Sequence, residues 1–342
     1  MAKHIKILDC TLRDGGYVND WAFAHNCISD TIDILNRSRV EYIECGFLTK
    51  NNNGSNRTLF GDIAKINQFL PRNFDIQKLV LMLKASDFDI SLLPQVKSDC
   101  CNTIRVIFKK YQINDALKSA KDLISKGYKI FLNPTFITLY NEDEVKHLID
   151  EVNKLSPFGF SLVDSIGSLD KKSLNRYIKL ADEYLDRNIS LCLHTHNSLQ
   201  LSMANAQEFL NSNIDREIIL DSSLYGMGRG AGNLQTEVIA DYLNANYSKE
   251  YDLQALYTIL DKYYYDFYET YRWGFSLKYY LCAKLGLHTD YGYYLVKKCN
   301  ISHSRASKIL SLIPKEKREI FDKKLIQGLV EKYSNENFIL TK

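Results

Sequence analysis

"IKILDCTLRDGG", residues 5–16, begins as an apolar strand and then places Arg13 and Asp14 side by side before two glycines. Short runs of the same kind, rich in β-branched and apolar residues, recur along the first two thirds of the chain. Continuous apolar runs are typical of strands that are buried on both faces of a parallel sheet. The eight expected strands are "IKILDCT" (5–11), "EYIECGFL" (41–48), "QKLVLML" (77–83), "TIRVIF" (103–108), "YKIFLNPTF" (128–136), "FSLVDSI" (160–166), "ISLCLHTH" (189–196) and "EIILDSS" (217–223).

Most of these runs are followed by segments with apolar residues at helical spacing. The segment 114–127 has Gly127 as its expected stop, and the segment 168–186 has Ser168 as its expected N-cap. A short third helix is expected near residues 91–96. Eight strand–helix units in roughly 250 residues predict a (β/α)₈ TIM barrel. An open, doubly wound sheet is the alternative that strand counting does not exclude.

The pattern changes after residue 248, where strand signals stop and helical spacing continues to the C-terminus. We therefore expect a barrel domain over residues 1–248 and a helical domain over residues 249–342. Twelve of the 23 tyrosines lie between Tyr251 and Tyr294. Tyrosines in such a region pack helices against the barrel or against a second subunit, which predicts a homo-oligomer, such as a dimer, through the C-terminal helices. Stacking of nucleic-acid bases on these rings is the alternative.

Composition limits the classes of partner. The 342 residues carry a net charge of only +3, which argues against nucleic acid or an anionic membrane as the main partner. The N-terminus lacks a signal-peptide pattern, and no segment reaches the length of a membrane span. None of the eight cysteines stands in C-x-x-C spacing, so we expect reduced thiols, a cytoplasmic location and no thiol nucleophile.

Polar residues gather at the expected C-terminal ends of three strands, which is where TIM barrels carry their catalytic groups. Arg13 and Asp14 follow the first strand, His194 and His196 end the seventh, and "GMGRGAGN" (226–233) follows the eighth. Because residues i and i+2 of a strand share a face, both imidazoles can reach one ion. Two imidazoles and one carboxylate suit Mn²⁺, Zn²⁺, Co²⁺ or Fe²⁺, and Mg²⁺ where waters complete the shell. The alternative is two ordinary strand histidines and a local Arg–Asp ion pair.

The chain resembles a known superfamily in four motifs: "LDCTLRDG", "YIECGF", "LHTHN" and "GMGRGAGN". These are similar to the motifs of the metal-dependent aldolase, lyase and acyltransferase superfamily, whose TIM barrels begin with D-x-T-L-R-D-G. The resemblance covers roughly residues 5–245 and is strongest to the 4-hydroxy-2-oxovalerate aldolases. It implies that Asp14, His194 and His196 hold a divalent cation, with Mn²⁺ as the first expectation. Asn233 would be a fourth ligand or would support the ligands from behind.

The same resemblance implies roles for two charged residues. Arg13 would stabilise the enolate that forms as a carbon–carbon bond is made or broken next to a 2-oxo acid. Glu44, in "YIECGF", would position Arg13 or a proton, or would be a buried structural partner of a barrel cation. The glycine-rich loop 226–233 also approximates a dinucleotide fingerprint, but no strand follows to bind a ribose, so no nucleotide cofactor is expected.

One departure concerns the general base. The aldolases of this branch carry a histidine shortly after the signature aspartate, whereas this chain has Gly16 and Tyr17 there. Tyr17 is a candidate only if its environment lowers its pKa. The C-terminal peptide "GLHTDYGYY" (286–294) offers His288 and Tyr291 as further candidates, and an exposed interhelical loop is the alternative for this peptide.

The sequence therefore predicts a metal-dependent aldolase that handles pyruvate or a similar 2-oxo acid together with an aldehyde. A Claisen-type acyltransferase that uses an acyl-CoA and a 2-oxo acid is the alternative enzyme. A non-catalytic metal-binding scaffold with a tyrosine-rich tail is the alternative of another class. Related aldolases pair with an aldehyde dehydrogenase, so the resemblance also implies a dehydrogenase as a partner.

Overall fold

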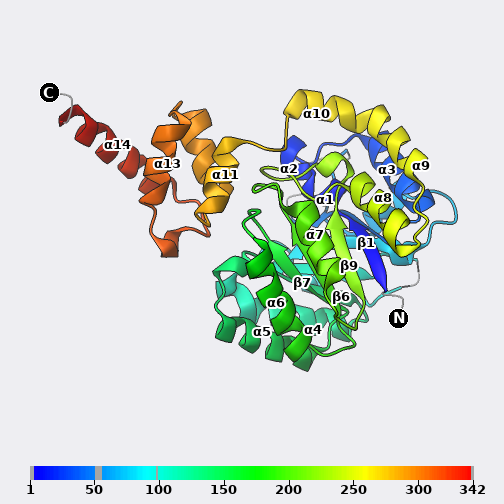
Figure 1. Cartoon of the computed structure of the whole chain (residues 1–342). Coiled ribbons are helices and arrows are strands. Elements are labelled where there is room, and N and C mark those ends of the chain that lie inside the picture. The colour runs from blue at the N-terminus through cyan, green and yellow to red at the C-terminus, as the bar shows by residue number, and fades with distance from the viewer. Residues whose placement is uncertain (1–3, 51–55, 98, 340–342) are drawn as a thin grey trace.

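Eight parallel strands close into a barrel (Figure 1). The computed structural model describes residues 4–50, 56–97 and 99–339. The first strand pairs on one side with the last and on the other with the second, which closes the ring and excludes an open sheet. The predicted TIM barrel is thus confirmed. The barrel strands are β1 (Ile5–Asp9), β2 (Tyr42–Leu48), β4 (Leu79–Lys84), β5 (Thr103–Phe108), β6 (Lys129–Pro134), β7 (Gly159–Asp164), β8 (Ser190–Thr195) and β9 (Ile218–Ser222), and β3 (Leu59–Phe60) pairs with β2 as an addition to the ring.

Helices connect most of the strands and cover the outside of the barrel (Figure 1). The strand-to-helix connection after β1 also contains two single-turn helices, the first of which carries Arg13 and Asp14. The helices up to residue 247 are α1 (Thr11–Asp14), α2 (Gly16–Asn19), α3 (His25–Arg37), α4 (Ile113–Ser125), α5 (Glu142–Leu155), α6 (Lys171–Tyr184), α7 (Ser202–Asn211) and α8 (Thr236–Tyr247).

Two local predictions were wrong. The helix expected near residues 91–96 is only a 3₁₀ turn, Ile90–Leu92, because Leu93 precedes Pro94 and is held extended, with φ −78° and ψ 125°. The N-cap of α6 is Asp170, whose side chain accepts a hydrogen bond from the Ser173 amide, and not Ser168. Gly127 does follow α4 and has a φ of +91°, which favours glycine.

The inside of the barrel is layered. One apolar layer is separate from the main core and consists of Leu8, Cys10, Tyr42, Val80, Phe131, Cys192 and Ile219. Inward-facing positions recur every two residues along a strand. Two residues beyond Tyr42, Cys192 and Ile219 therefore come Glu44, His194 and Asp221, and all three are buried. The interior changes from apolar to charged toward the C-terminal ends of the strands.

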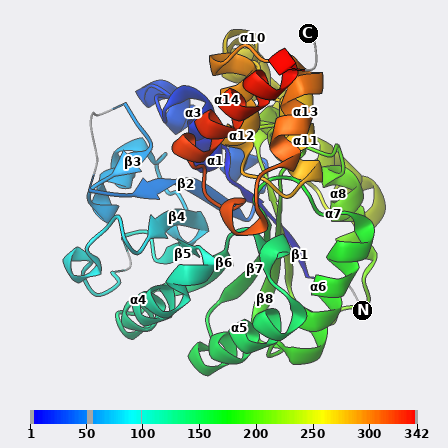
Figure 2. The same cartoon turned by 90° about the vertical axis from the view of Figure 1, so that its left-hand side faces the viewer.

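The C-terminal helices pack in two ways. The first of them lie on the barrel, because α9 contacts α3 and Tyr264 joins the main hydrophobic core, where its hydroxyl lies 2.8 Å from Thr31 Oγ1. From Cys282 onward, a second hydrophobic cluster forms around Leu295 and Leu310. Figure 2 shows these later helices at the end of the barrel where α1 lies. The division of the chain into domains at residue 248 stays a prediction. The helices are α9 (Leu253–Ile259), α10 (Tyr265–Tyr271), α11 (Leu277–Lys284), α12 (Thr289–Tyr293), α13 (His303–Ser311) and α14 (Lys323–Ile339), with π-helical turns at Leu260–Tyr264 and Tyr294–Lys298.

None of the described helices is both long enough and apolar enough to cross a bilayer.

Candidate active site

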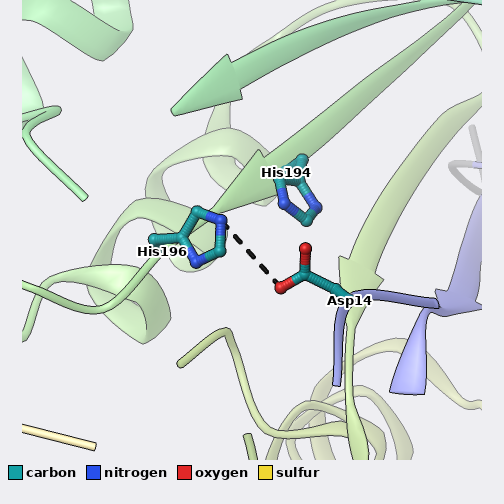
Figure 3. Close-up of side chains that lie close together, drawn as sticks. All are labelled: Asp14, His194 and His196. Carbon is teal, nitrogen blue, oxygen red and sulfur yellow. Dashed lines mark ion pairs between the residues drawn. The ribbon is translucent and has the colours of Figure 1, made fainter. Parts of the chain in front are cut away.

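Three side chains meet at the C-terminal end of the barrel. Asp14 at the end of α1 faces His194 on β8 and His196 immediately after that strand (Figure 3). One potential ligand atom from each of the three lies within 4.8 Å of the others, and all three residues are buried. His196 Nε2 lies 4.0 Å from Asp14 Oδ2. The structure therefore brings together the two imidazoles and the carboxylate that the spacing in the sequence singled out.

Hydrogen bonds set the orientation of both imidazoles. His194 Nδ1 lies 3.0 Å from Asp221 Oδ2, and His196 Nδ1 lies 3.2 Å from the carbonyl oxygen of Gly232. Both partners are acceptors, so each Nδ1 carries the proton and each Nε2 keeps a free lone pair. Burial lowers the pKa of His196 to about 4, with Asp14 opposing the shift, so this ring is neutral at pH 7. Imidazoles oriented from behind in this way are typical of metal sites.

Asp14 is held as a carboxylate. Burial alone would raise its pKa, but Arg13 and the two imidazoles outweigh burial and hold the pKa of Asp14 well below its usual range. Its Oδ1 accepts a hydrogen bond from Arg13, and its Oδ2 accepts one from Asn233 Nδ2 at 2.8 Å. Asn233 thus contacts a predicted ligand, while its own Oδ1 is buried and has no hydrogen-bond partner among the residues that the structure describes.

A chain of alternating charges connects Asp14 with His194 through the barrel interior. Arg13 Nε donates to Glu44 Oε2 at 2.7 Å, and Arg105 Nη1 donates to the same oxygen at 3.3 Å. Arg105 Nη2 in turn donates to Asp221 Oδ2 at 2.5 Å, the oxygen that also faces His194. Each cation thus bridges two carboxylates, so the buried charges compensate one another.

Glu44 lies at the centre of this network. It contacts both Arg13 and Arg105, so the positioning partner of Arg13 and the partner of a buried barrel cation are one and the same side chain. Burial would lower the pKa of Arg13, but Glu44 and Asp14 reverse that shift and raise it. The three carboxylates of the network, Asp14, Glu44 and Asp221, exceed its two guanidinium groups by one negative charge, which is complementary to a cation.

Two further charged residues of the site, Arg105 and Asp221, were not predicted from the sequence. Arg105 stands in the middle of the strand "TIRVIF", where an arginine in an otherwise apolar run is a signal of a paired, buried charge. Asp221 ends the run "IIL" at the C-terminal face in the same way as Asp14 follows the first strand. Both residues are at most 1% exposed, and only the closed ring of strands places them next to Glu44 and His194.

A cavity of about 390 Å³ opens beside the three candidate ligands, within the range of small-molecule sites. Arg13, Asp14, His194 and His196 form its inner part. Its walls come from the ends of β4 to β8, from the loop after β9 and from the C-terminal region. The other lining residues are Tyr17, Met82, Lys84, Ser86, Asp87, Ile107, Phe108, Lys109, Tyr111, Gln112, Asn133, Thr135, Phe136, Val163, Ser165, Arg229 and His288.

His288 reaches this cavity from the loop before α12. Its ring stacks on Phe136 with 6.1 Å between the ring centres, and its Nε2 accepts a hydrogen bond from Arg229 Nη2 at 2.9 Å. Burial and the charge of Arg229 lower the pKa of His288 to about 4. The C-terminal peptide that contains His288 is therefore part of the cavity wall and not an exposed loop.

The two tyrosine candidates differ in place. Tyr17 lines the cavity, and its ring packs edge-on against Trp21 with 4.8 Å between centres. Tyr291 does not line it: its side chain belongs to the second hydrophobic cluster, and its hydroxyl lies 2.8 Å from the carbonyl oxygen of Lys317 and 2.9 Å from that of Ile320. Burial also raises the pKa of Tyr291. Tyr291 therefore has a structural role, and its prediction as a candidate base was wrong.

The donor set fits a divalent cation. Two Nε2 lone pairs have no hydrogen-bond donor among the described residues, and they face a carboxylate that stays ionised. A first-row divalent cation such as Mn²⁺ or Zn²⁺ accepts this combination of nitrogen and oxygen ligands. The buried Oδ1 of Asn233, which has no partner in the described part of the chain, is a further oxygen on a side chain that already contacts Asp14.

The chain is similar to proteins of a known family. A family model described as HMGL-like matches residues 4–262. Among curated relatives, the 4-hydroxy-2-oxovalerate aldolase 2 of Rhodococcus jostii is 25% identical over 250 residues, which is 70% of this chain and 69% of the relative. The oxaloacetate decarboxylase of Mycobacterium tuberculosis is 22% identical over 237 residues, 68% of each chain.

Solved structures share the fold. The N-terminal domain of a protein provisionally described as an aldolase, from Bacteroides vulgatus, superposes with a TM-score of 0.75 at 26% identity, over 88% of this chain and 99% of that one. The hydroxymethylglutaryl-CoA lyase of Pseudomonas aeruginosa superposes with a TM-score of 0.59 at 16% identity, over 77% of this chain and 92% of that one, a likeness of fold alone.

Proposed function

Because this chain belongs to the HMGL-like family, whose model covers residues 4–262, we propose that it is a divalent-metal-dependent aldolase, a carbon–carbon lyase. In this proposal it makes or breaks a bond between C3 of a pyruvate-type 2-oxo acid and an aldehyde carbon. The observation that carries the proposal is the meeting of Asp14, His194 and His196 beside a cavity that Arg13 also lines.

Asp14, His194 and His196 would hold the cation, with Mn²⁺ as the first choice and Mg²⁺, Zn²⁺ or Co²⁺ as alternatives. When bound, such a cation polarises the carbonyl oxygen of a 2-oxo acid as a Lewis acid. Asn233 orients Asp14 through its amide nitrogen and offers its carbonyl oxygen as a fourth donor. Asp221 and the carbonyl of Gly232 keep the two imidazoles in the required tautomer.

Arg13 supplies fixed positive charge where negative charge develops. Its Nε and Nη1 are held by Glu44 and Asp14, while its Nη2 makes no hydrogen bond within the described ranges. Because the guanidinium is already oriented by two buried carboxylates, it needs no rearrangement to stabilise the enolate oxygen of the 2-oxo acid. Glu44 is a positioning residue in this scheme, since it contacts Arg13 and is not among the residues that line the cavity.

His288 is the proposed acceptor of the C3 proton. It lines the cavity and, with its pKa lowered to about 4, is unprotonated at neutral pH, as a base must be. Its Nε2 already accepts a hydrogen bond from Arg229, so proton transfer to this atom requires Arg229 to turn away. Tyr17, the other candidate base on the cavity wall, is the alternative.

Exchange of the C3 protons of pyruvate in D₂O tests the proposal most directly. We expect the Mn²⁺-loaded protein to exchange these protons, as followed by ¹H NMR, and the chelator-treated protein to lose the exchange. Loss of exchange in Asp14→Asn would support the proposed cation site. A metal-loaded protein that exchanges the protons of neither pyruvate nor a panel of 2-oxo acids would contradict the aldolase and favour a scaffold. Release of free CoA from acetyl-CoA and a 2-oxo acid would favour the acyltransferase.

The base is tested by His288→Ala and Tyr17→Phe. If His288 accepts the proton, His288→Ala slows exchange by about 10²-fold or more, in line with the usual contribution of a general base, and Tyr17→Phe retains most of it. The reverse pattern would assign the base to Tyr17. Full exchange in both variants would contradict both assignments.

The remaining parts of the proposal concern the surroundings of the enzyme. We propose a cytoplasmic location, which the eight free cysteine thiols support. Phe275 in the loop before α11, Leu277 at the start of α11 and Leu312 just after α13 are 59%, 42% and 51% exposed, and we propose that they join two copies of the chain. Light scattering of the wild type and of Phe275→Glu with Leu312→Glu tests this dimer. The same scattering experiment, with an aldehyde dehydrogenase added, tests the dehydrogenase partner.

A further inference from the structure

Two lysines occupy inward-facing positions at the ends of neighbouring strands. Met82 and Lys84 on β4, and Ile107 and Lys109 at the end of β5, all line the cavity, as residues two apart on a strand should. Lys84 pairs in register with Ile107, the residue two positions before Lys109. The two ammonium groups therefore belong to one part of the cavity wall.

These lysines are poorly neutralised. Within the described ranges Lys109 makes no ion pair, and the carboxylate that most influences it, Glu319, is farther away than an ion pair would allow. Lys84 lies 3.3 Å from Asp87, but both side chains are more than 40% exposed, so water screens this pair. Lys84, Lys109 and Arg229 all line the same cavity, and burial together with the charges of Arg229 and Lys84 acts to lower the pKa of Lys109.

Arg229 completes the group from the loop after β9. Its guanidinium lies above the Tyr17 ring at 5.4 Å and donates to His288, while Asp290 is 3.4 Å away. Asp290 is half exposed and therefore offsets only part of the charge of Arg229. Arg229, Lys84 and Lys109 together leave this part of the cavity electropositive.

The proposed metal chemistry does not account for these three cations. Arg13 is already the cation beside Asp14, and its charge and that of Arg105 are balanced by buried carboxylates. A 2-oxo acid held between Arg13 and the candidate ligands would place its own carboxylate there. An anion on the other reactant would account for Lys84, Lys109 and Arg229. Three neighbouring cations with too few carboxylates to neutralise them attract anionic groups.

We propose that the aldehyde substrate of this enzyme carries an anionic group, a phosphate or a carboxylate, and that Lys84, Lys109 and Arg229 bind that group. This inference rests on the proposed aldolase function and names the class of its second substrate. In the addition, the 2-oxo acid loses a proton from C3, C3 bonds to the aldehyde carbon, and the aldehyde oxygen gains a proton. The anionic group itself is unchanged, and no oxidant or reductant is consumed.

Matched pairs of aldehydes test the proposal. With pyruvate and Mn²⁺-loaded enzyme, we compare glyceraldehyde 3-phosphate with glyceraldehyde, and succinic semialdehyde with butanal. We expect kcat/KM to favour an anionic member by at least ~10-fold, equivalent to about 1.4 kcal/mol. The first pair tests a phosphate and the second a carboxylate. If the wild-type kcat/KM for each neutral aldehyde equals that for its anionic partner, the proposal is wrong.

Variants locate the preference. Lys109→Met and, separately, Lys84→Met should each lower the ratio of anionic to neutral kcat/KM by about tenfold. Lys110→Met is the matched control, because Lys110 is the next residue, pairs with Glu144 at 2.5 Å and does not line the cavity. The ratio should not change in this control. An anionic preference that survives both Lys109→Met and Lys84→Met also overturns the proposal.

Binding of an unreactive anion separates this inference from the proposed function. Glycerol 3-phosphate and 4-hydroxybutyrate carry the two anionic groups but no aldehyde. Calorimetry should detect binding of at least one of them, weakened about tenfold in Lys109→Met, and no binding of glycerol. If pyruvate exchanges no protons, the aldolase fails while this titration still decides on the cation group. If exchange occurs but neither anion binds, the inference about the aldehyde fails alone.

Discussion

His194 Nδ1 lies 3.0 Å from Oδ2 of Asp221, and the same oxygen accepts a hydrogen bond from Arg105. The carboxylate therefore fixes the tautomer of a candidate metal ligand while it neutralises a buried guanidinium. Burial would raise the pKa of Asp221, but Arg105 and His194 lower it, so the charge is present at neutral pH. A ligand of this kind depends on the residue behind it as much as on its own position.

Asp221→Asn should weaken binding of Mn²⁺ by about 10–100-fold, the usual effect of removing the partner of a metal-bound histidine. The neutral amide no longer favours a proton on His194 Nδ1, and an imidazole protonated on Nε2 cannot bind the cation. Titration calorimetry measures the affinity, and circular dichroism checks that the variant is folded. Asp215→Asn, at an exposed aspartate, is the control. An affinity for Mn²⁺ equal to that of the wild type would contradict the proposed role of Asp221.

Gly228→Ala should displace Asp14 without changing any ligand. A Cβ at this position would lie 2.6 Å from Asp14 Oδ2 and 2.2 Å from Asn233 Nδ2, both closer than real contacts allow. Asp14 is held on its other side by Arg13 and cannot retreat freely. We expect affinity for Mn²⁺ to fall about tenfold or more, as measured by calorimetry. Gly328→Ala is the control, because a Cβ there meets no atom of the described residues within 4 Å. If Gly228→Ala binds Mn²⁺ as tightly as the wild type, the loop that carries residue 228 has moved and Asp14 has not.

Much of the fold could be predicted from the sequence, because each barrel strand is a continuous apolar run that periodicity alone detects. All eight expected strands exist, and the bounds of 103–108 are the same in the structure. The helix expected near residues 91–96 does not form because Pro94 restricts the backbone of Leu93 to extended conformations. A hydrophobic pattern does not reveal this local effect. Ser168 is not the N-cap because its amide and its hydroxyl both donate hydrogen bonds to Asp164 Oδ1.

The site was predicted in part for a similar reason. His194 and His196 are two apart on one strand, so their common direction follows from strand geometry. The partnership of Glu44 with Arg105 joins β2 to β5 across the barrel interior, and no spacing within the sequence indicates it. Tyr291 lies outside the cavity because of how the C-terminal helices pack against one another. The sequence pattern predicts these helices but not their relative positions.

Arg105→Met should destabilise the folded protein by about 3–5 kcal/mol, because it leaves two buried carboxylates without their shared cation. Glu44 and Asp221 are both fully buried partners of Arg105, and methionine fills the volume without supplying charge. Urea denaturation measures the free energy of unfolding. Arg37→Met is the control: Arg37 pairs with Asp33 on the surface of α3 at 59% exposure, and its loss should cost about 0.5 kcal/mol or less. Similar losses in the two variants would contradict the network.

Asp9 gives the stability of this fold a predictable dependence on pH. It is 1% exposed at the end of β1, where it accepts hydrogen bonds from Thr236 Oγ1 at 2.6 Å and from the Thr11 amide at 2.9 Å. Burial raises its pKa from 3.8 to about 6, although both hydrogen bonds oppose the shift. The folded state therefore binds the proton more tightly than the unfolded state. The resulting stability is fully present below pH 4 and is lost as the pH rises through 6.

Asp9→Asn should remove this dependence, because an amide cannot ionise. The carbonyl oxygen of the new side chain can still accept from the Thr11 amide, and Thr236 can turn its hydroxyl toward Ser222, which lies 2.8 Å away. Free energies of unfolding at pH 4, 5, 6 and 7.5 should show the variant gaining on the wild type as the pH rises, by up to about 3 kcal/mol, since each pKa unit corresponds to about 1.4 kcal/mol. A difference that stays constant across this range, or that grows toward acid pH, would mean that Asp9 is ionised in the folded protein and that the β1 end tolerates a buried charge.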